Sequence, residues 1–308
     1  MTKVFIDGSA GTTGLRIRER LSDRKDLELI ILPEETRKDP AARADALNSA
    51  AVSFLCLPDA AAIEAASFVT DPDAVIIDTS TAHRVAEGWT HGMPELAGQR
   101  DKLKSGKRIA NPGCHATGFI SLVAPLVASG LIQKDARLSC FSLTGYSGGG
   151  KKMIAEYESP DMDPLYQAPR QYGLGQTHKH LPEMAKICGL DHAPVFCPIV
   201  APYYAGMEVT VPLTPADTSA SPEEIKAVYR DYYQSGLIRF AEGTDENGFL
   251  SAGAFAGRDD LEIAVFGNEE RILLVSRFDN LGKGASGAAI QNMNIVLGLD
   301  EKTGLVVK

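Results

Sequence analysis

The sequence predicts a two-domain α/β protein, in which a doubly wound parallel sheet is followed by an α+β domain with a mostly antiparallel sheet. Within the first 110 residues, short apolar strands alternate with helical segments, which is the pattern of parallel βαβ units. After residue 136, strands with alternating apolar and polar residues dominate instead. A chain of 308 residues also exceeds one ordinary hydrophobic core, so two domains are expected.

Composition narrows the classes of function. The net charge of −9 disfavours a nucleic-acid partner, which needs a basic surface, although a few local cations suffice for a small anionic substrate. No apolar run approaches the roughly 20 residues that span a membrane, so no membrane partner is expected. Residues 1–7 lead directly into a strand pattern, which leaves no room for a signal peptide and predicts a cytoplasmic protein.

The five cysteines are odd in number and include no C-x-x-C pair. Neither a disulfide framework nor a zinc site is indicated, and a reducing compartment fits this pattern. The histidines and cysteines are too scattered to suggest any other metal site, so no metal is expected. The cysteines are Cys56, Cys114, Cys140, Cys188 and Cys197.

A strand at residues 3–7 leads into a glycine-rich turn and then into a helix with Leu15, Ile17 and Leu21 on its apolar side. Glycines let a backbone approach a pyrophosphate, and the N-terminus of a helix favours the phosphate charge. The spacing is G-x-x-G-x-x-G rather than the common G-x-G-x-x-G, and a simple tight turn is the alternative. Its position at the start of an alternating β/α pattern favours a Rossmann-type nucleotide site. The predicted cofactor-binding residues of this turn are Gly8, Ser9, Ala10, Gly11, Thr12, Thr13 and Gly14.

The second predicted strand, residues 27–32, is followed by Glu34, Glu35, Arg37 and Lys38. In NAD-binding proteins an acidic residue near the end of this strand accepts hydrogen bonds from the ribose. The adjacent cations Arg37 and Lys38 fit a 2′-phosphate and favour NADP, whereas the two glutamates leave NAD open. A solvated charged loop is the alternative for either cation alone.

Polar residues follow the later strands of the parallel sheet. Strand ends in such a sheet face the ligand crevice, so Ser80 and Arg84 within residues 78–84 are candidates for ligand contact. Residues 89–96 have the composition of a loop. The predicted strands are 52–57, 74–77 and 108–110, and the predicted helices are 40–48 and 60–69.

Residues 111–118, Asn-Pro-Gly-Cys-His-Ala-Thr-Gly, form a Pro-Gly turn that places Cys114 before an apolar helical stretch at 119–127. The N-terminus of a helix carries free N–H donors and a partial positive charge, which favour a thiolate over a thiol. Cys114 is therefore a candidate nucleophile. A small buried cysteine in a strand-to-helix turn is the alternative.

The second half of the chain contains strands of antiparallel character and a closing helix with an apolar stripe that includes Ala289 and Met293. These segments predict the second, α+β domain. The predicted strands are 137–144, 195–199, 208–213, 261–266 and 271–277, and the predicted helices are 180–189, 222–235 and 284–299.

Residues 145–152, Gly-Tyr-Ser-Gly-Gly-Gly-Lys-Lys, nearly match the phosphate-binding P-loop, but Lys152 replaces the hydroxyl residue that would bind Mg²⁺. We therefore reject ATP hydrolysis. A flexible cationic loop that closes over an anion, with Lys151 and Lys152, and an ordinary surface hairpin loop both remain open.

Residues 177–183 read Thr-His-Lys-His-Leu-Pro-Glu. Pro182 and Glu183 suit the first turn of a helix, so His180 is expected at or just before a helix N-terminus. That position disfavours an imidazolium and keeps a neutral imidazole available as a base. His178 points to the same side in an extended chain, but no third ligand supports a metal site.

The glycine turn, the Asn111–Thr117 segment and the His178–Glu183 segment together resemble the short form of the N-acetyl-γ-glutamyl-phosphate reductase family, a relative of aspartate-semialdehyde dehydrogenase. The resemblance extends over essentially the whole chain. It includes Arg37-Lys38-Asp39, Leu57-Pro58-Asp59, residues 147–152 and the segment 279–287.

The resemblance implies a Rossmann-type NADP-binding domain at residues 1–114 and 283–308 and a catalytic domain at 115–282. A homo-oligomer, either a dimer or a tetramer, is expected. The same resemblance implies that Cys114 is the nucleophile and His180 the acid/base. It also implies that Lys283 and Gly284 lie near the nicotinamide. The residues that it assigns to the substrate are Asn111, Arg84, His178, Lys151, Lys152 and Glu183.

The implied activity is NADPH-dependent reduction of N-acetylglutamyl 5-phosphate to N-acetylglutamate 5-semialdehyde and phosphate through a thioester on Cys114, a step of arginine biosynthesis. Aspartate-semialdehyde dehydrogenase uses the same Cys/His chemistry and is the alternative enzyme. A thiol hydrolase needs no nucleotide turn, and a non-catalytic nucleotide sensor needs no thiol, so both remain alternatives from other classes.

Overall fold

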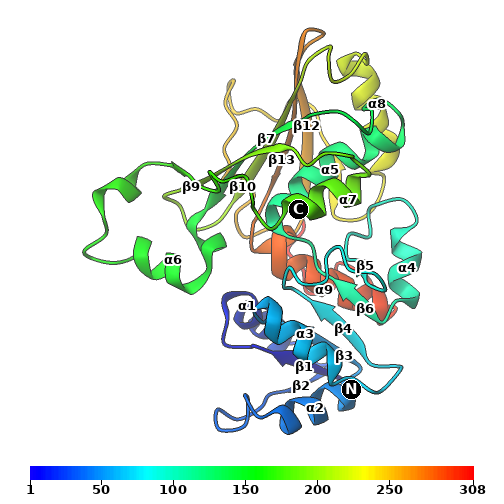
Figure 1. The fold of residues 1–308 in the computed structure, drawn as a ribbon, viewed down its shortest axis with the longest axis vertical. Coiled ribbons are helices and arrows are strands. Elements are labelled where there is room, and N and C mark those ends of the chain that lie inside the picture. Colours follow the sequence, from blue (N-terminus) through cyan, green and yellow to red (C-terminus); the bar gives the residue numbers. More distant parts are fainter. The chain divides into compact units, whose positions relative to one another are not determined.

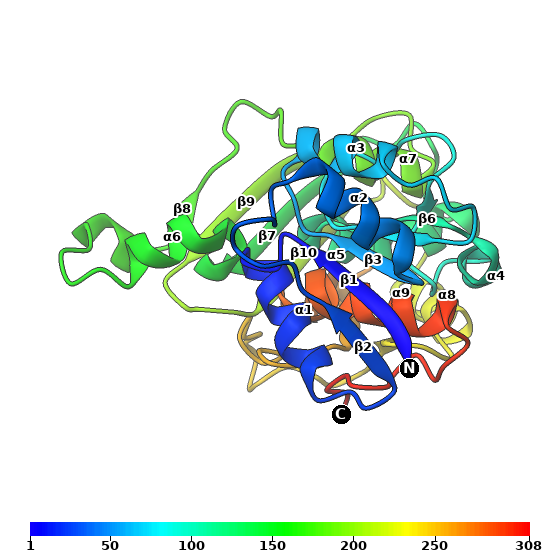
Figure 2. The same ribbon diagram turned by 90° about the horizontal axis from the view of Figure 1, so that it is seen from below.

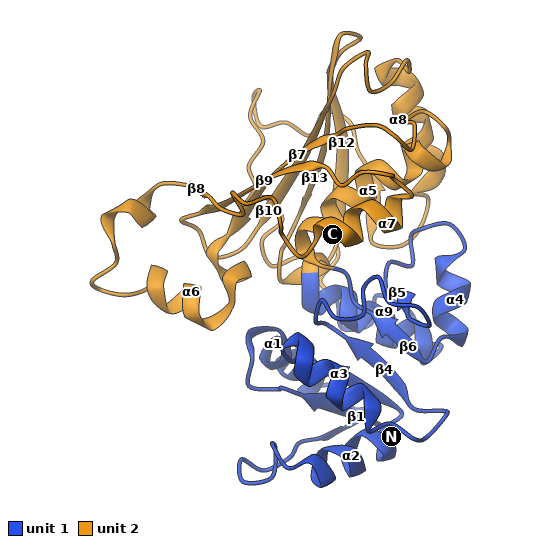
Figure 3. Ribbon diagram, in the orientation of Figure 1, with its two compact units in different colours: residues 1–112, 285–305 blue, residues 113–284, 306–308 orange.

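The computed structural model describes residues 1–308 and divides into two compact units (Figure 3). Unit 1 comprises residues 1–112 and 285–305, and unit 2 comprises 113–284 and 306–308. Three short segments differ from the predicted division, since residues 113–114, 283–284 and 306–308 all belong to unit 2. Cys114 belongs to unit 2 because it begins helix α5 (Cys114–Ala128). Residues 306–308 also belong to unit 2, since the backbone of Val306 exchanges hydrogen bonds with Asp259.

Unit 1 contains a six-stranded, entirely parallel sheet with the order β2-β1-β3-β4-β6-β5, which confirms the predicted doubly wound architecture. Two of its elements were not predicted. β5 has only two residues, and α4 carries a single buried apolar residue, Leu103, so neither produces a periodic pattern. The strands are β1 (Thr2–Asp7), β2 (Leu27–Ile30), β3 (Val52–Leu55), β4 (Val75–Asp78), β5 (Thr90–His91) and β6 (Arg108–Ala110).

Helices cover both faces of this sheet, as Figure 2 shows. Alternation along β1 sends Val4 and Ile6 into the core below α1 and α9, and Phe5 into the core below α2 and α3. The predicted apolar side of α1 is confirmed at Ile17 and Leu21, whereas Leu15 is exposed. The helices are α1 (Thr12–Ser22), α2 (Pro40–Ser49), α3 (Asp59–Ser67), α4 (Gln99–Ser105) and α9 (Gly287–Val296).

Unit 2 contains a seven-stranded mixed sheet with the order β11-β12-β13-β10-β7-β9-β8. Four of its six strand pairings are antiparallel; β7 with β9 and β11 with β12 are parallel. The strands are β7 (Ser139–Gly145), β8 (Arg170–Gln171), β9 (Val195–Ala201), β10 (Met207–Leu213), β11 (Ile238–Phe240), β12 (Leu261–Asn268) and β13 (Arg271–Phe278).

Helices α5, α7 (Leu181–Cys188) and α8 (Pro222–Tyr232) form the helical layer of unit 2 (Figure 1). Gly118 lets α5 lie directly on the sheet, because a Cβ there would collide with the side chain of Val209 in β10. The hydroxyl of Tyr229 in α8 donates to the carbonyl of Leu122 in α5 at 2.6 Å. These contacts fix the helix that carries Cys114. No helix of the structure is both long enough and apolar enough to cross a membrane.

The predicted loop at residues 145–152 is instead a 3₁₀ turn, η1 (Tyr146–Gly149), followed by helix α6 (Gly150–Tyr157). Three successive glycines suggested a loop, but the following Lys-Lys-Met-Ile-Ala-Glu sequence consists largely of good helix formers. Figure 1 shows α6 on an arm that extends away from the sheet of unit 2, with η2 (Pro164–Gln167). Lys151 and Lys152 lie on the exposed surface of this helix.

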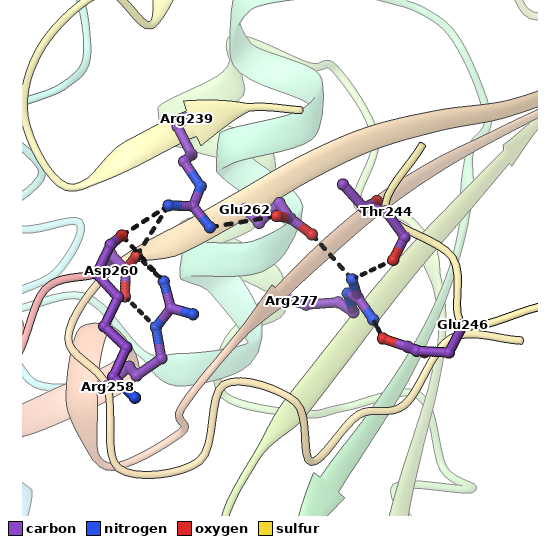
Figure 4. Close-up of polar contacts among 8 residues, drawn as sticks. Arg239, Thr244, Glu246, Arg258, Asp260, Glu262 and Arg277 are labelled. Atoms are coloured by element: carbon purple, nitrogen blue, oxygen red, sulfur yellow. Dashed lines mark hydrogen bonds and ion pairs between the residues drawn. The ribbon is translucent and has the colours of Figure 1, made fainter. Parts of the chain in front are cut away.

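A ladder of ion pairs crosses the β11–β12–β13 end of the sheet (Figure 4). Arg277 donates to Glu262 on the neighbouring strand at 2.9 Å and to Glu246 at 2.6 Å. Glu262 also pairs with Arg239 at 3.4 Å, and Asp260 pairs with Arg258. Since Arg277 and Glu262 are both buried, each neutralises a charge that would otherwise be costly to bury, and the ladder ties the 244–260 segment to the sheet.

Candidate active site

Cys114 is the first residue of α5, directly after the N-cap Gly113, and its side chain is half-buried. The first turn of α5 contains no acidic residue, so its dipole and free N–H groups favour negative charge at the sulfur. The predicted position of Cys114 at a helix N-terminus is confirmed. Its role as the nucleophile remains a prediction.

A tight turn from the end of β13 packs against this cysteine. Asp279 holds the turn by accepting hydrogen bonds from the backbone N–H groups of Leu281 at 2.7 Å and Gly257 at 2.6 Å. A Cβ on Gly284 would lie only 2.9 Å from the Cβ of Cys114, so this position requires glycine. The turn continues into the π-helical segment η3 (Gly282–Ser286), which is why α9 begins at residue 287 and not at the predicted 284. The buried Lys283 lies in the same turn.

Glu183 connects the histidine segment to the cysteine helix. It lies in the first turn of α7 and is 1% exposed. Its two carboxylate oxygens accept from the backbone N–H of Gly113 at 3.1 and 3.3 Å. The structure therefore shows Glu183 binding the backbone at the N-terminus of α5; its predicted contact with substrate remains a prediction.

His178 and His180 lie side by side, with ring centroids 4.7 Å apart. His180 is the N-cap residue of α7, which confirms its predicted place at a helix N-terminus, and its ring is buried. His178 is half-exposed, and its Nδ1 accepts from the backbone N–H of His180 at 3.2 Å. Since Nδ1 is the acceptor, the neutral ring of His178 carries its proton on Nε2.

His115 was not singled out from the sequence. Its ring is buried between two hydroxyl groups, with Nδ1 2.7 Å from Ser142 Oγ and Nε2 2.7 Å from the hydroxyl of Tyr172. Burial, with a smaller effect from His178, lowers the pKa of His115 to about 3, so the ring is neutral. Its centroid lies 5.5 Å from that of His180. The position of His115 directly after Cys114, the predicted nucleophile, was the feature of the sequence that could have indicated it.

The glycine turn of unit 1 has the form that a nucleotide site requires. Gly8 has a φ of +83°, and a Cβ there would collide with the backbone of Cys56. A Cβ on Gly14 would lie 2.5 Å from the carbonyl oxygen of Gly8, so only glycine lets α1 begin so close to β1. The turn is closed by a hydrogen bond from Gly11 N–H to the Gly8 carbonyl at 2.9 Å.

A cavity of about 240 Å³ adjoins this turn and is lined in part by Gly8, Ser9, Arg37 and Lys38. Arg37 pairs with Glu34, but its buried Nε makes no hydrogen bond in the structure, which leaves a donor for an anion. The residues present thus fit the adenosine-phosphate end of a dinucleotide. Arg43 also lines the cavity but is paired with Asp7 at 2.9 Å and Glu64 at 3.2 Å.

The other candidates of unit 1 make hydrogen bonds to residues of the same unit. Ser80 donates to Asp78 at 2.7 Å, and the Nε of Arg84 donates to the carbonyl of Asn111 at 3.0 Å. The side chain of Asn111 in turn donates to the carbonyl of Ala285 at 3.0 Å. The structure shows what orients these residues, and their contacts with ligands remain predictions.

Sequence comparisons show close relatives over almost the whole chain. The N-acetyl-gamma-glutamyl-phosphate reductase 2 of Nostoc sp. is 44% identical, with 98% of this chain and 99% of the relative covered. The N-acetyl-gamma-glutamyl-phosphate reductase of Brucella ovis is 45% identical, with 96% and 99% covered. The chain belongs to the N-acetyl-gamma-glutamyl-phosphate reductase family. A family of oxidoreductases fits both the nucleotide turn of unit 1 and the cysteine site of unit 2.

Further comparisons agree with this family and with the two-part fold. Residues 114–280 match the semialdehyde dehydrogenase dimerisation domain. The aspartate semialdehyde dehydrogenase of Francisella tularensis superposes with a TM-score of 0.71 at 15% identity, covering 96% of this chain and 100% of that one. The enzyme of Candida albicans, solved with NADP, superposes with a TM-score of 0.69 at 15% identity, covering 97% and 99%. At such identities these neighbours show the fold, which confirms the predicted Rossmann-type and α+β architecture.

Proposed function

We propose that this member of the family reduces N-acetyl-L-glutamyl 5-phosphate to N-acetyl-L-glutamate 5-semialdehyde and phosphate, with NADPH as the reductant, in arginine biosynthesis. The observation that supports this most is Cys114 at the start of α5, with Glu183 binding the backbone there from α7, the helix that follows His178 and His180. A nucleophilic sulfur and an acid/base are the groups that reduction of an acyl phosphate needs.

The first step is acyl transfer to the sulfur. The Cys114 thiolate attacks the acyl carbon of the substrate, the bond from that carbon to the phosphate oxygen breaks, and phosphate leaves with the electron pair. A thioester on Cys114 remains. Backbone N–H groups at the start of α5 stabilise the negative oxygen that develops during the attack. Lys151 and Lys152, which are exposed on α6, stay as proposed phosphate contacts.

Reduced nicotinamide, when bound, supplies the hydride that converts the thioester carbon to the aldehyde. During this step the chain must hold the carbonyl oxygen while negative charge develops on it, and must then release the thiolate as the C–S bond breaks. A ring N–H that donates to this oxygen and later recovers its proton performs both tasks.

Of the two histidines, we propose His178 for this donation, in place of the His180 assignment made from the sequence. The backbone N–H of His180 occupies Nδ1 of His178, which leaves the Nε2–H of His178 as the donor. His178 is also half-exposed, whereas His180 is 6% exposed. His180 then acts through its backbone N–H, which holds His178 in this tautomer. Comparison of the His178→Asn and His180→Asn variants decides which histidine donates the proton.

We propose NADP in preference to NAD because Arg37 and Lys38 line the cavity beside the glycine turn. Replacing both with Ala is expected to raise the Kd for NADPH by about 10- to 100-fold, since hydrogen bonds to charged groups contribute about 1.5–3 kcal/mol. The Kd for NADH should change little. Fluorescence titration with both cofactors measures this, with Lys102→Ala combined with Lys104→Ala on α4 as a matched control. Equal losses for both cofactors would assign the two cations to a solvated surface.

We propose a homodimer built on the open face of the sheet of unit 2, in agreement with the matched dimerisation domain. The strand register places Phe141, Val195 and Leu273 on this face, and they are 43%, 57% and 41% exposed. Such a patch is typical of a protein interface. Sedimentation should give a dimer for the wild-type chain and a shift toward monomer for Leu273→Lys. A wild-type monomer at micromolar concentration would exclude this interface.

The activity itself is tested in the reverse direction. We expect phosphate-dependent reduction of NADP⁺ with N-acetylglutamate 5-semialdehyde, and turnover at least about 100-fold slower with aspartate semialdehyde, because a site adapted to one acyl group leaves polar groups unpaired with another. Faster turnover of aspartate semialdehyde would select the alternative enzyme, and absence of both reactions with intact thiol reactivity would favour a hydrolase.

A further inference from the structure

A buried carboxylate lies at the start of the glycine turn of unit 1. Asp7 is the last residue of β1, directly before Gly8, and both residues line the cavity beside the turn. The phosphates of a dinucleotide bring negative charge to a turn of this kind. An ionised carboxylate in the same place repels them, because little water is present to screen the two charges. A site of this design therefore needs a group that neutralises Asp7.

Arg43 in α2 neutralises this carboxylate. Its Nε donates to Oδ2 of Asp7 at 3.0 Å, and its Nη2 lies 2.9 Å from the same oxygen. The side chains of Arg43 and Asp7 are 8% and 5% exposed, so the ion pair is shielded from water. Arg43 lines the cavity as well. The wall of the cavity next to the glycine turn thus contains a closed ion pair, and not a free carboxylate.

Two further contacts hold the guanidinium of Arg43 in this position. Its Nη1 donates to Oε2 of Glu64 in α3 at 3.2 Å. Its central carbon lies 5.5 Å from the centre of the ring of Phe68, the C-cap residue of α3. Arg43 therefore joins the end of β1 to α2 and α3, the two helices on that face of the sheet. Because of these contacts, its charge is directed at Asp7.

The charge state of Asp7 depends on Arg43. Burial raises the pKa of Asp7, and the hydrogen bond and charge of Arg43 oppose this rise, with a smaller effect from the N–H of Gly8. Glu64 adds to the rise. The thiol of Cys56, which follows β3, stays neutral because burial raises its pKa to about 12. The other charged residues that line the cavity, both on the loop after β2, are Arg37 and Lys38.

We propose that Arg43 is a positioning residue for the cofactor, which neutralises Asp7 beside Gly8 and so allows the glycine turn to accept the phosphates of a nicotinamide dinucleotide. Arg43 acts through Asp7 and does not contact the cofactor. The proposal rests on the proposed binding of NADP in this cavity. The phosphates next to the turn are common to NADP and NAD, so Arg43 supports the binding of both cofactors, unlike Arg37 and Lys38.

The test measures cofactor binding without turnover. Isothermal titration calorimetry determines the Kd for NADP⁺ and for NAD⁺ at about pH 6 and at about pH 8.5, on either side of the pKa expected for a buried, unpaired carboxyl. The wild-type chain is compared with Arg43→Met, with Arg43→Met combined with Asp7→Asn, and with Arg24→Met. Arg24 is the matched control, because it pairs with Asp26 at 2.6 Å in the same unit, its side chain is 9% exposed, and it does not line the cavity.

At about pH 8.5, Arg43→Met is expected to raise the Kd for both cofactors by about tenfold, because Asp7 is then an unpaired carboxylate beside the phosphates. At about pH 6 the Kd should return to within about threefold of the wild-type value. Loss of Arg43 raises the pKa of the buried Asp7 further, so its carboxyl is protonated and neutral at the lower pH. Adding Asp7→Asn should restore the wild-type Kd at both pH values. Arg24→Met should leave every Kd unchanged.

The double variant separates this role from a direct contact with the cofactor. If it bound both cofactors as weakly as Arg43→Met at about pH 8.5, Arg43 would act on the cofactor or on the fold and not through Asp7, and the proposal would be wrong. A loss confined to NADP⁺, or one that does not change with pH, would overturn it as well.

Folding of each variant is checked by circular dichroism. If Arg43→Met does not fold, Arg43→Gln, which keeps a hydrogen-bond donor for Asp7 but removes the charge, decides by the same criteria. Absence of binding of either cofactor to the wild-type chain would overturn the proposed function. Wild-type binding that Arg43→Met leaves unchanged would overturn this inference alone, which distinguishes the two claims.

Discussion

Cys114→Ser is expected to lower phosphate-dependent oxidation of N-acetylglutamate 5-semialdehyde by at least about 10⁴-fold, as removal of an enzyme nucleophile commonly does. A serine hydroxyl does not ionise near neutral pH, and one helix N-terminus cannot compensate for this difference from a thiol. Binding of NADP⁺ should be retained, because the glycine turn and its cavity lie in unit 1. Steady-state turnover and cofactor titration on the same preparation measure both effects.

A second cysteine provides the control for this variant. Cys197 is half-buried in β9 of the same unit, and Cys197→Ser is expected to keep turnover close to that of the wild type. If Cys114→Ser retained near-wild-type turnover, or if the two variants lost equal activity, Cys114 would not be the nucleophile. Loss of NADP⁺ binding together with turnover would instead indicate a folding defect.

His178→Asn is expected to lower kcat by about 10²- to 10⁴-fold, the usual contribution of a general acid–base group. The amide oxygen of Asn can still accept from the His180 backbone N–H, so the local structure should remain while the titratable proton donor is lost. His180→Asn should cost less, since Asn is itself a favourable N-cap residue for α7. Measurement of kcat against pH for both variants checks the order.

The reverse order would return the acid/base role to His180, as the sequence first indicated. Equal losses with unchanged pH profiles would remove both rings from proton transfer and leave them as structural parts of the site. Thermal unfolding of both variants is measured together with kcat, so that activity lost through unfolding is distinguished from activity lost because proton transfer fails.

Local patterns predicted most of the architecture of unit 1, because its elements other than β5 and α4 carry a signal of their own. The sequence itself shows the run of apolar residues in β1 that fill the cores on the two faces of the sheet. It also shows the glycines of the turn, which closely approach the backbone of Cys56 and of Gly8. The Pro-Gly turn before Cys114 predicted the N-terminus of α5. The proline in the first turn of α7 predicted the helix N-terminus after His180.

Other features depend on contacts between distant segments and had no local signal. The ring of His115 is neutral because it is buried beside Ser142 and Tyr172, which are 27 and 57 residues away in the chain. Glu183 binds Gly113, 70 residues away, and from the sequence it looked like a substrate contact. Residues 145–152 were predicted as a loop because three glycines outweighed the helical preference of the residues that follow.

The central claim is that Cys114 carries the acyl group. The most direct measurement mixes the protein with N-acetylglutamyl 5-phosphate in the absence of NADPH and determines its intact mass after acid quenching. The predicted result is one added N-acetylglutamyl group, located on the peptide that contains Cys114 and released on addition of NADPH. Phosphate release with no added mass, or an added mass on any other residue, would contradict the account.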